Sequence, residues 1–265
     1  SSFSLWWICM GHDYWMYRGD EAYMKSLLPA YRGILSWYEQ WMKPDYSLAY
    51  VPHWFFADWS AGFPGGEPIR EKDGNSAFQD LMYILTLDAA APMEDAFGIS
   101  GMAAHYRDLA SKMRATIRDK YWNAEKGIFA DTHDHRSYSQ HVNALAVLAD
   151  VVTGEEAAGV MTKTLNDPSL AQATIYFRYY VHLALNKAGM GDQLLDNLQI
   201  WRDQMALGLT TWAEMPEPSR SDCHAWGASP NIEFFRILLG IDSDAPGFKK
   251  IRIAPSLGSL KEVSG

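Results

Sequence analysis

Apolar residues recur at helical spacing through almost the whole 265-residue chain, and this periodicity is the strongest constraint on its fold. Glycine, proline or a short polar stretch closes most of the apolar segments, as at Gly19-Asp20 and Pro44. Pro29 lies inside one segment and is expected to kink or split that helix. We predict helices over the segments 3–18, 21–42, 76–95, 99–121, 139–152, 155–165, 173–187, 191–207 and 231–239.

The links between these segments alternate in length. Short links, such as Gly19-Asp20 and 187–191, are typical of neighbouring antiparallel helices. Long loops at 44–75, 122–138 and 208–228 recur on alternate links, so we expect them to gather on one face, where long loops usually carry function. The pattern predicts an all-α fold, part of an (α/α)6 toroid built from stacked helical hairpins with a cleft at one end.

A different pattern begins near the end of the chain. From Gly247 to Pro255, apolar and basic residues alternate, which predicts a strand with its basic side chains in solvent. No low-complexity linker divides the chain before this point. We therefore predict that residues 1–242 form the α/α-barrel domain and that residues 243–265 begin a C-terminal β-domain.

Charge and hydropathy exclude several classes of partner. The formal net charge of −9 argues against nucleic acids and anionic membranes, because their phosphates would be repelled. No apolar run approaches the roughly 20 residues needed to cross a bilayer. Cys9 and Cys223 lie far apart and are interpreted as free thiols, and the His133-Asp134-His135 triplet lacks a third ligand at suitable spacing. We predict neither a metal nor a cofactor.

Aromatic residues are unusually frequent, with 11 Trp, 14 Tyr and 11 Phe. Two explanations fit this composition. Large side chains can fill the core of a wide toroid, or indole faces can stack on the apolar faces of sugar rings in a cleft. The two explanations are compatible, so the position of each tryptophan must separate them.

The most specific cluster of polar and aromatic residues lies in the loop 208–228. Glu214 is suited to polarise a water, and His224 is suited to hydrogen-bond a sugar or the carboxylate. Trp212 and Trp226 would form apolar walls, which tend to raise a carboxyl pKa. Residue types alone still favour a solvated loop carboxylate for Glu214, because most such groups have no catalytic role.

Two further clusters lie at 52–59 and 139–143. Asp58 would either bind sugar hydroxyls or cap a short helix. Trp54 and Trp59 would either stack on sugars or pack in the core. For His141, at the start of a predicted helix, a structural role is favoured.

In their order along the chain, these clusters resemble the family 78 glycoside hydrolases, the bacterial and fungal α-L-rhamnosidases. Each match alone is weak, whereas the ordered set covers nearly the whole chain and is specific, above all in its last three members. The matching stretches are Phe3-Ser-Leu-Trp-Trp7, Phe56-Ala-Asp-Trp59, Ser139-Gln-His-Val-Asn-Ala-Leu-Ala146, Thr211-Trp-Ala-Glu214, Cys223-His-Ala-Trp-Gly227 and Pro246-Gly-Phe-Lys-Lys-Ile-Arg-Ile-Ala-Pro255.

The resemblance implies an (α/α)6 catalytic barrel followed by a β-sandwich. It also implies inverting hydrolysis of terminal α-L-rhamnosides, with a carbohydrate as the partner. Glu214 matches the general base of the family and His224 its sugar-binding histidine. Trp59 matches a stacking tryptophan, and Trp7 does so less closely.

One part of the family pattern is missing. The general acid of the family lies in an acidic, arginine-containing motif upstream of the segment that matches Phe3–Trp7, and no such motif occurs here. Six hairpins of ordinary length also need more residues. We therefore expect the first hairpin and the acid to lie outside this chain, which alone would have little activity. Export to the periplasm or the cell exterior is compatible with such an enzyme, and the oligomeric state stays open.

Two other functions remain compatible with the residues. Related toroids act on other glycans as glucuronyl hydrolases, trehalases or lyases, and activity on uronate-containing polymers would favour these. A tryptophan-lined, non-catalytic carbohydrate-binding protein would bind sugars without turnover. A purely structural scaffold is disfavoured, because it leaves the three aromatic and polar loops unexplained.

Overall fold

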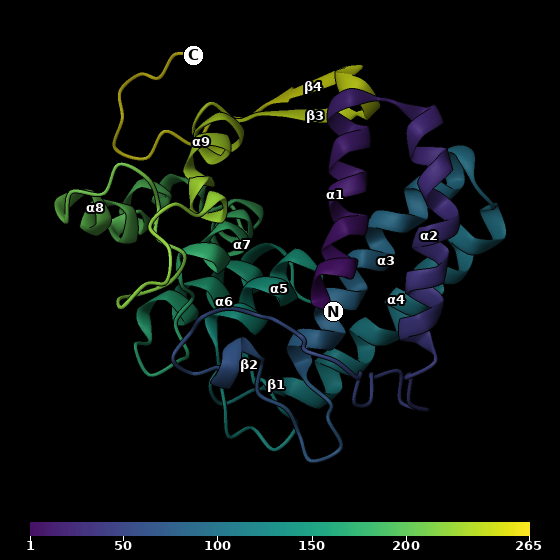
Figure 1. Cartoon of the computed structure of the whole chain (residues 1–265). Coiled ribbons are helices and arrows are strands. Elements are labelled where there is room, and N and C mark those ends of the chain that lie inside the picture. Colours follow the sequence, from purple (N-terminus) through teal and green to yellow (C-terminus); the bar gives the residue numbers. More distant parts are fainter.

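Helical hairpins account for most of the computed structural model, which describes all 265 residues (Figure 1). A π-helical turn, Phe234–Leu238, continues the last helix. No helix is both long and apolar enough to cross a membrane. The nine helices are α1 (Ser2–Arg18), α2 (Glu21–Glu39), α3 (Ala77–Phe97), α4 (Ser100–Tyr121), α5 (Gln140–Leu148), α6 (Gly154–Asn166), α7 (Ile175–Lys187), α8 (Gln199–Ala206) and α9 (Pro230–Glu233).

The helices form two layers. Helices α1, α3, α5 and α7 pack against one another in chain order, and α9 packs on α7. Helices α2, α4 and α6 pack outside this row (Figure 1). The difference follows from sequence, because α3 and α5 are apolar on most of their surface, whereas α2, α4 and α6 bury a single apolar stripe. The predicted fold class, part of an α/α toroid, is confirmed.

Short and long links have different structures. Gly19 ends α1 in the left-handed conformation, and Asp20 caps α2 by accepting a hydrogen bond from the Tyr23 N–H at 3.0 Å. The long loops meet at the opposite end of the hairpins. There, the Ala77 N–H donates to the Asp131 carbonyl at 3.0 Å, which joins the start of α3 to the loop before α5.

A β-hairpin near the C-terminus packs on α1 (Figure 1). Strands β3 (Ile241–Ala245) and β4 (Lys250–Ile253) are antiparallel. The Tyr17 hydroxyl donates to Asp242 at 2.9 Å, and the Tyr17 ring meets Phe248 edge-on. The predicted strand is confirmed as β4, whereas β3 was not predicted, because Asp-Ser-Asp lacks the apolar alternation of a strand. The domain division at 242–243 stays a prediction.

Some helix bounds differ from the predictions. The segment 191–207 was predicted as one helix, but it contains two 3-10 turns, Gly191–Gln193 and Leu195–Asn197, before α8. The C-terminal segment packs at this point, since the Gly258 N–H donates to Asp192 at 2.8 Å. Pro29 does not split α2, which is continuous from Glu21 to Glu39. A further small hairpin joins β1 (Trp122–Asn123) and β2 (Ile128–Phe129).

Gly240, between the π-turn and β3, should be hard to replace. Its φ is +67°, and an added Cβ would lie 2.1 Å from the carbonyl carbon and oxygen of Ala254. We expect Gly240→Ala to lower the free energy of unfolding by more than the roughly 1–2 kcal/mol that a left-handed alanine costs, as measured by urea denaturation.

The matched control is Gly208→Ala. Gly208 has a φ of +85°, and nothing lies within 4 Å of its added Cβ, so this variant carries the backbone strain without the clash. Equal losses in the two variants would contradict the close packing of Gly240 against the end of β4.

Candidate active site

In the loop between α8 and α9, the backbone around Glu214 pairs with the backbone of residues 221–224 through hydrogen bonds. The Glu214 N–H donates to the Ser221 carbonyl and the His224 N–H donates to the Trp212 carbonyl, both at 2.8 Å. The Thr211 hydroxyl also donates to the Asp222 carbonyl. These bonds hold the backbone on both sides of Glu214, so its carboxylate has a defined direction.

The Glu214 carboxylate contacts two side chains, one of them from another loop, and the residue is 6% exposed. The Trp59 indole N–H donates to Oε1 at 3.2 Å, and the Arg220 guanidinium donates to the same oxygen. The hydrogen bond from Arg220 lowers the pKa of Glu214 below its usual value, helped by the charges of Arg220 and His224. This direction is opposite to the rise that apolar walls alone would produce. The structure therefore holds Glu214 as a carboxylate with Oε2 free of hydrogen-bond partners.

Aromatic side chains contact both the carboxylate and the backbone of Glu214. The Trp226 indole N–H donates to the Glu214 carbonyl at 2.9 Å, and the Trp226 ring stacks on Phe56 with centroids 5.7 Å apart and an interplanar angle of 4°. The His224 ring lies 4.3 Å from Trp226, and Trp59 lies 5.1 Å from Phe56. We call Phe56, Trp59, Glu214, His224 and Trp226 the Glu214 cluster.

Asp58 and His141 lie behind the cluster and are completely buried. Asp58 accepts hydrogen bonds from His141 Nε2 and the Thr174 N–H, both at 2.7 Å, and from the Thr174 hydroxyl. It also accepts from the Trp59 N–H at 2.9 Å. These bonds tie the loop carrying Trp59 to the starts of α5 and α7. Their geometry suits a positioning role, which fits the structural interpretation of His141, and leaves no Asp58 oxygen open to a sugar.

The remaining tryptophans differ in their placement. Trp54 is 48% exposed and lies 6.3 Å from Trp59, so it extends the aromatic surface outwards. Trp7 lies on α1, where it meets Tyr31 edge-on, and no ring contact joins it to the Glu214 cluster. Trp212 packs on a small core that includes residues of α7, α8 and the π-turn, and it lies beside Gly227. Thus the structure brings Trp59 and Trp226 to Glu214, with Trp54 at the edge.

Sequence reasoning missed two members of this region. Arg220 carried no signal, because a basic residue in a polar loop is ordinarily solvated. Phe56 was quoted only within a matching stretch, although it lies between Trp59 and Trp226. Tyr176 is 9% exposed and lies 4.8 Å from Trp226, so it forms the buried side of the same aromatic surface.

A cavity of about 1150 Å³ lies beside the Glu214 cluster and not within it. Ala213 and Met215 line it, whereas Glu214 between them faces the cluster. Gln204 on α8, which also lines the cavity, accepts a hydrogen bond from the Ala213 N–H at 3.0 Å and so fixes this wall.

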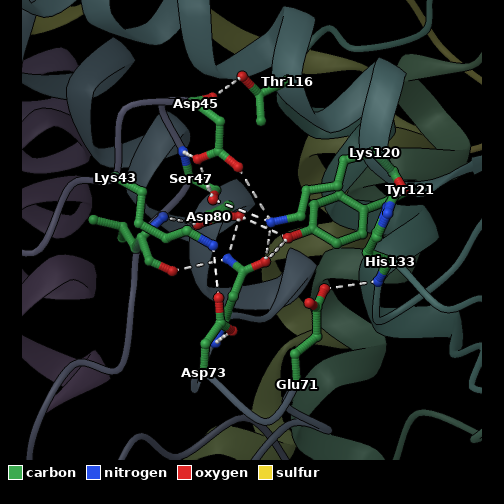
Figure 2. A network of polar contacts seen from close by, with 12 residues as sticks. Lys43, Asp45, Ser47, Glu71, Asp73, Asp80, Thr116, Lys120, Tyr121 and His133 are labelled. Atoms are coloured by element: carbon green, nitrogen blue, oxygen red, sulfur yellow. Dashed lines mark hydrogen bonds and ion pairs between the residues drawn. The ribbon is translucent and has the colours of Figure 1, made fainter.

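A second polar network anchors the base of the loop 44–75 (Figure 2). Buried Asp80 accepts hydrogen bonds from the Leu48 N–H at 2.8 Å and from Asn75 Nδ2 and the Tyr121 hydroxyl at 3.0 Å. The Lys120 ammonium donates to Asn75 at 2.7 Å. Both ends of the loop are therefore fastened to α3 and α4, which limits how far the segment carrying Trp59 can move.

This network should make stability depend on pH. Burial raises the pKa of Asp80 to about 7, against opposing hydrogen bonds from Leu48, Asn75 and Tyr121 and the charge of Lys120. Because the pKa of Asp80 is higher in the folded state than its unfolded value near 3.8, ionisation of Asp80 disfavours the folded state. The stability contribution of protonated Asp80 is therefore fully present below about pH 3.8 and is lost as the pH rises to about 7. We expect the free energy of unfolding, relative to Asp80→Asn, to fall between about pH 4 and 7 in urea denaturation. Parallel pH profiles for the two proteins would contradict this.

Comparison with known proteins bears on the family. The family model described as the bacterial alpha-L-rhamnosidase 6 hairpin glycosidase domain matches residues 3–175. The chain belongs to this family. The domain accounts for the stacked hairpins, and the matched part contains Asp58, Trp59 and His141, while Glu214 lies beyond it. A search of curated proteins gives no match.

Solved α-L-rhamnosidases share the architecture of this family member. The GH78 rhamnosidase of Bacillus sp. GL1 superposes with a TM-score of 0.84 at 25% identity, over 97% of this chain and 28% of that one. The rhamnosidase of Klebsiella oxytoca, solved with rhamnose bound, superposes with a TM-score of 0.77 at 21% identity, over 89% of this chain and 46% of that one. The α-L-rhamnosidase of Dictyoglomus thermophilum superposes with a TM-score of 0.73 at 19% identity, over 95% of this chain and 29% of that one. This chain therefore spans less than half the length of each.

Proposed function

We propose that this chain carries the base side of the active site of an inverting glycoside hydrolase that removes terminal α-L-rhamnosyl residues, with Glu214 as the base. The observation that carries the proposal is the Glu214 cluster. It holds a largely buried, ionised carboxylate against the indole N–H of Trp59, and the rings of Trp59 and Trp226 both contact Phe56. Membership of the rhamnosidase family supports the reaction class.

The two oxygens of Glu214 would have separate tasks. Oε1 accepts from Trp59, which fixes the plane of the carboxylate, while Oε2 is free to accept a proton from water. In an inverting reaction, that water attacks the anomeric carbon from the face opposite the leaving group. An acid roughly 6.5–9.5 Å from the base would protonate the leaving oxygen. Glu214 is the single carboxylate of the cluster, so the proposal assigns the acid to polypeptide outside residues 1–265.

The sugar contacts follow from the aromatic surface. A rhamnosyl ring presents C–H groups and a methyl group, which pack well on indole faces such as those of Trp59 and Trp54. His224, beside Trp226 and half-buried, is placed to exchange hydrogen bonds with ring hydroxyls. Rhamnose is the ligand of the Klebsiella oxytoca structure, which supports this choice of sugar.

The deciding experiment is hydrolysis of an aryl α-L-rhamnoside by the natural polypeptide that contains these residues, with the first anomer released followed by NMR. We expect turnover with β-L-rhamnose appearing first. Release of α-L-rhamnose first would contradict inversion. Turnover of uronate-containing glycans in place of rhamnosides would favour a glucuronyl hydrolase or lyase. Binding without turnover would favour a carbohydrate-binding protein.

A further inference from the structure

The side chain of Arg220 occupies the place that the proposed function gives to the sugar. Its guanidinium lies over the Trp59 ring, 4.8 Å from the centroid, and donates to Oε1 of Glu214. One side chain thus covers the proposed stacking platform and engages the proposed base. A sugar ring and this guanidinium cannot share the same face of Trp59.

The backbone and the side chain of Arg220 differ in how firmly they are held. The neighbouring Ser221 carbonyl pairs with the Glu214 N–H, and the Ser219 hydroxyl donates to the same carbonyl at 2.8 Å, so the backbone is fixed. The Arg220 side chain is 63% exposed, forms its ion pair with the Glu214 carboxylate and lies over the Trp59 face. Exposed contacts of this kind are weak and readily exchanged for water.

We propose that Arg220 is a displaceable plug, an inference that rests on the proposed function. In the empty site, the Arg220 guanidinium covers the Trp59 ring and neutralises the Glu214 carboxylate. The incoming sugar ring displaces the guanidinium into solvent. Expulsion uncovers the stacking face and removes the cation from the carboxylate in one movement. The base then faces the water without its counter-ion, while Trp59 still holds Oε1. Arg220 is therefore a specificity-determining residue, since a ligand that does not pack on the indole cannot dislodge it.

The test compares Arg220→Gln and Arg220→Lys with wild type in the natural polypeptide that contains these residues. L-rhamnose is added to ¹⁵N-labelled protein and the Trp59 indole N–H signal, assigned with Trp59→Phe, is followed by NMR. Because no guanidinium must be displaced, we expect Arg220→Gln to bind rhamnose about 3- to 10-fold more tightly, the effect of removing a weak competing contact. Arg220→Lys keeps the charge without the flat stacking group and should fall between the two.

Arg107→Gln is the matched control, because Arg107 forms an exposed ion pair with Asp95 on the outer helix α4, and its rhamnose affinity should equal wild type. Weaker binding by Arg220→Gln would mean that Arg220 holds the sugar, and equal binding would mean that it does not obstruct; either result overturns the plug. D-glucuronate binding that requires Arg220 would likewise overturn it, by assigning the guanidinium to an acidic sugar.

A second readout separates this inference from the proposed function. The same indole signal reports the titration of Glu214, which faces Arg220, His224 and Trp59. In Arg220→Gln the titration should move upwards towards the ordinary glutamate range. If neither protein binds rhamnose while the titration moves, the proposed sugar is wrong. If wild type binds rhamnose but the titration and affinity do not change in the variant, the plug is wrong and the proposed function stands.

Discussion

Glu214→Gln should reduce kcat/KM on an aryl α-L-rhamnoside by about 10²–10⁴-fold, the usual contribution of a general base. The amide keeps the shape of the side chain and an oxygen that can accept a hydrogen bond from the Trp59 indole N–H, so the fold should not change. It cannot accept a proton from water at neutral pH. The measurement needs the natural polypeptide that contains these residues, because the proposal places the acid outside them.

Glu217→Gln is the control for this variant. Glu217 lies three residues further along the same loop, is exposed, and accepts a hydrogen bond from the Ser219 N–H at 3.2 Å. We expect its activity to equal wild type. Wild-type activity in Glu214→Gln, or equal losses in both variants, would contradict the assignment of the base. In wild type, the lowered pKa of Glu214 should also keep the acid limb of kcat/KM below the usual glutamate value.

Asp58→Ala should give the largest loss of stability, about 3–5 kcal/mol, which is typical when one partner of a buried pair is removed. Asp58 and His141 are both fully buried, and the substitution would also leave the Thr174 N–H without an acceptor. Urea denaturation measures the loss. Because Asp58 also fixes the Trp59 backbone, sugar binding should weaken under conditions in which the variant remains folded.

Two further variants test the cause of that loss. Asp58→Asn keeps one acceptor oxygen without the charge, so it should fall between wild type and Asp58→Ala. Asp222→Ala removes an exposed carboxylate near the same site that makes no side-chain hydrogen bond, and it should leave stability close to wild type. If Asp58→Ala unfolds at the wild-type urea concentration, the buried pair does not hold the loop.

The spacing of apolar residues predicts a helix well where the helix buries either one face or nearly its whole surface. The apolar stripes of α1 to α7 are local signals, so their ranges lie close to the predicted ones. The prediction was wrong at 191–207, where a distant segment decides the conformation: Ser256 and Gly258 pack against Gly191 and Asp192. Strand β3 was missed for a similar reason, since its polar residues pair with β4 and α1 and carry no pattern of their own.

The sequence predicts several residues of the candidate site, but it does not predict which of them contact one another. Glu214, His224 and Trp59 stood out as aromatic and polar loop residues, and the family resemblance gave them roles. The hydrogen bond between Trp59 and Glu214 spans 155 positions, so no local pattern contains it. The same is true of Asp58 and Thr174, 116 positions apart. Arg220 was missed because its importance comes from the ring it covers, which sequence does not show.

The contact between α1 and the β3–β4 hairpin can form only late in synthesis of the protein, long after α1 has been made. Tyr17 and Asp242 are 225 positions apart, so the last turn of α1 stays uncovered until the ribosome has released almost the whole segment. At roughly 5–20 residues per second, this interval is on the order of 10–45 s. A translation product that stops before β3 would retain the packed row of α1, α3, α5 and α7 and expose the Tyr17 end to chaperones and proteases.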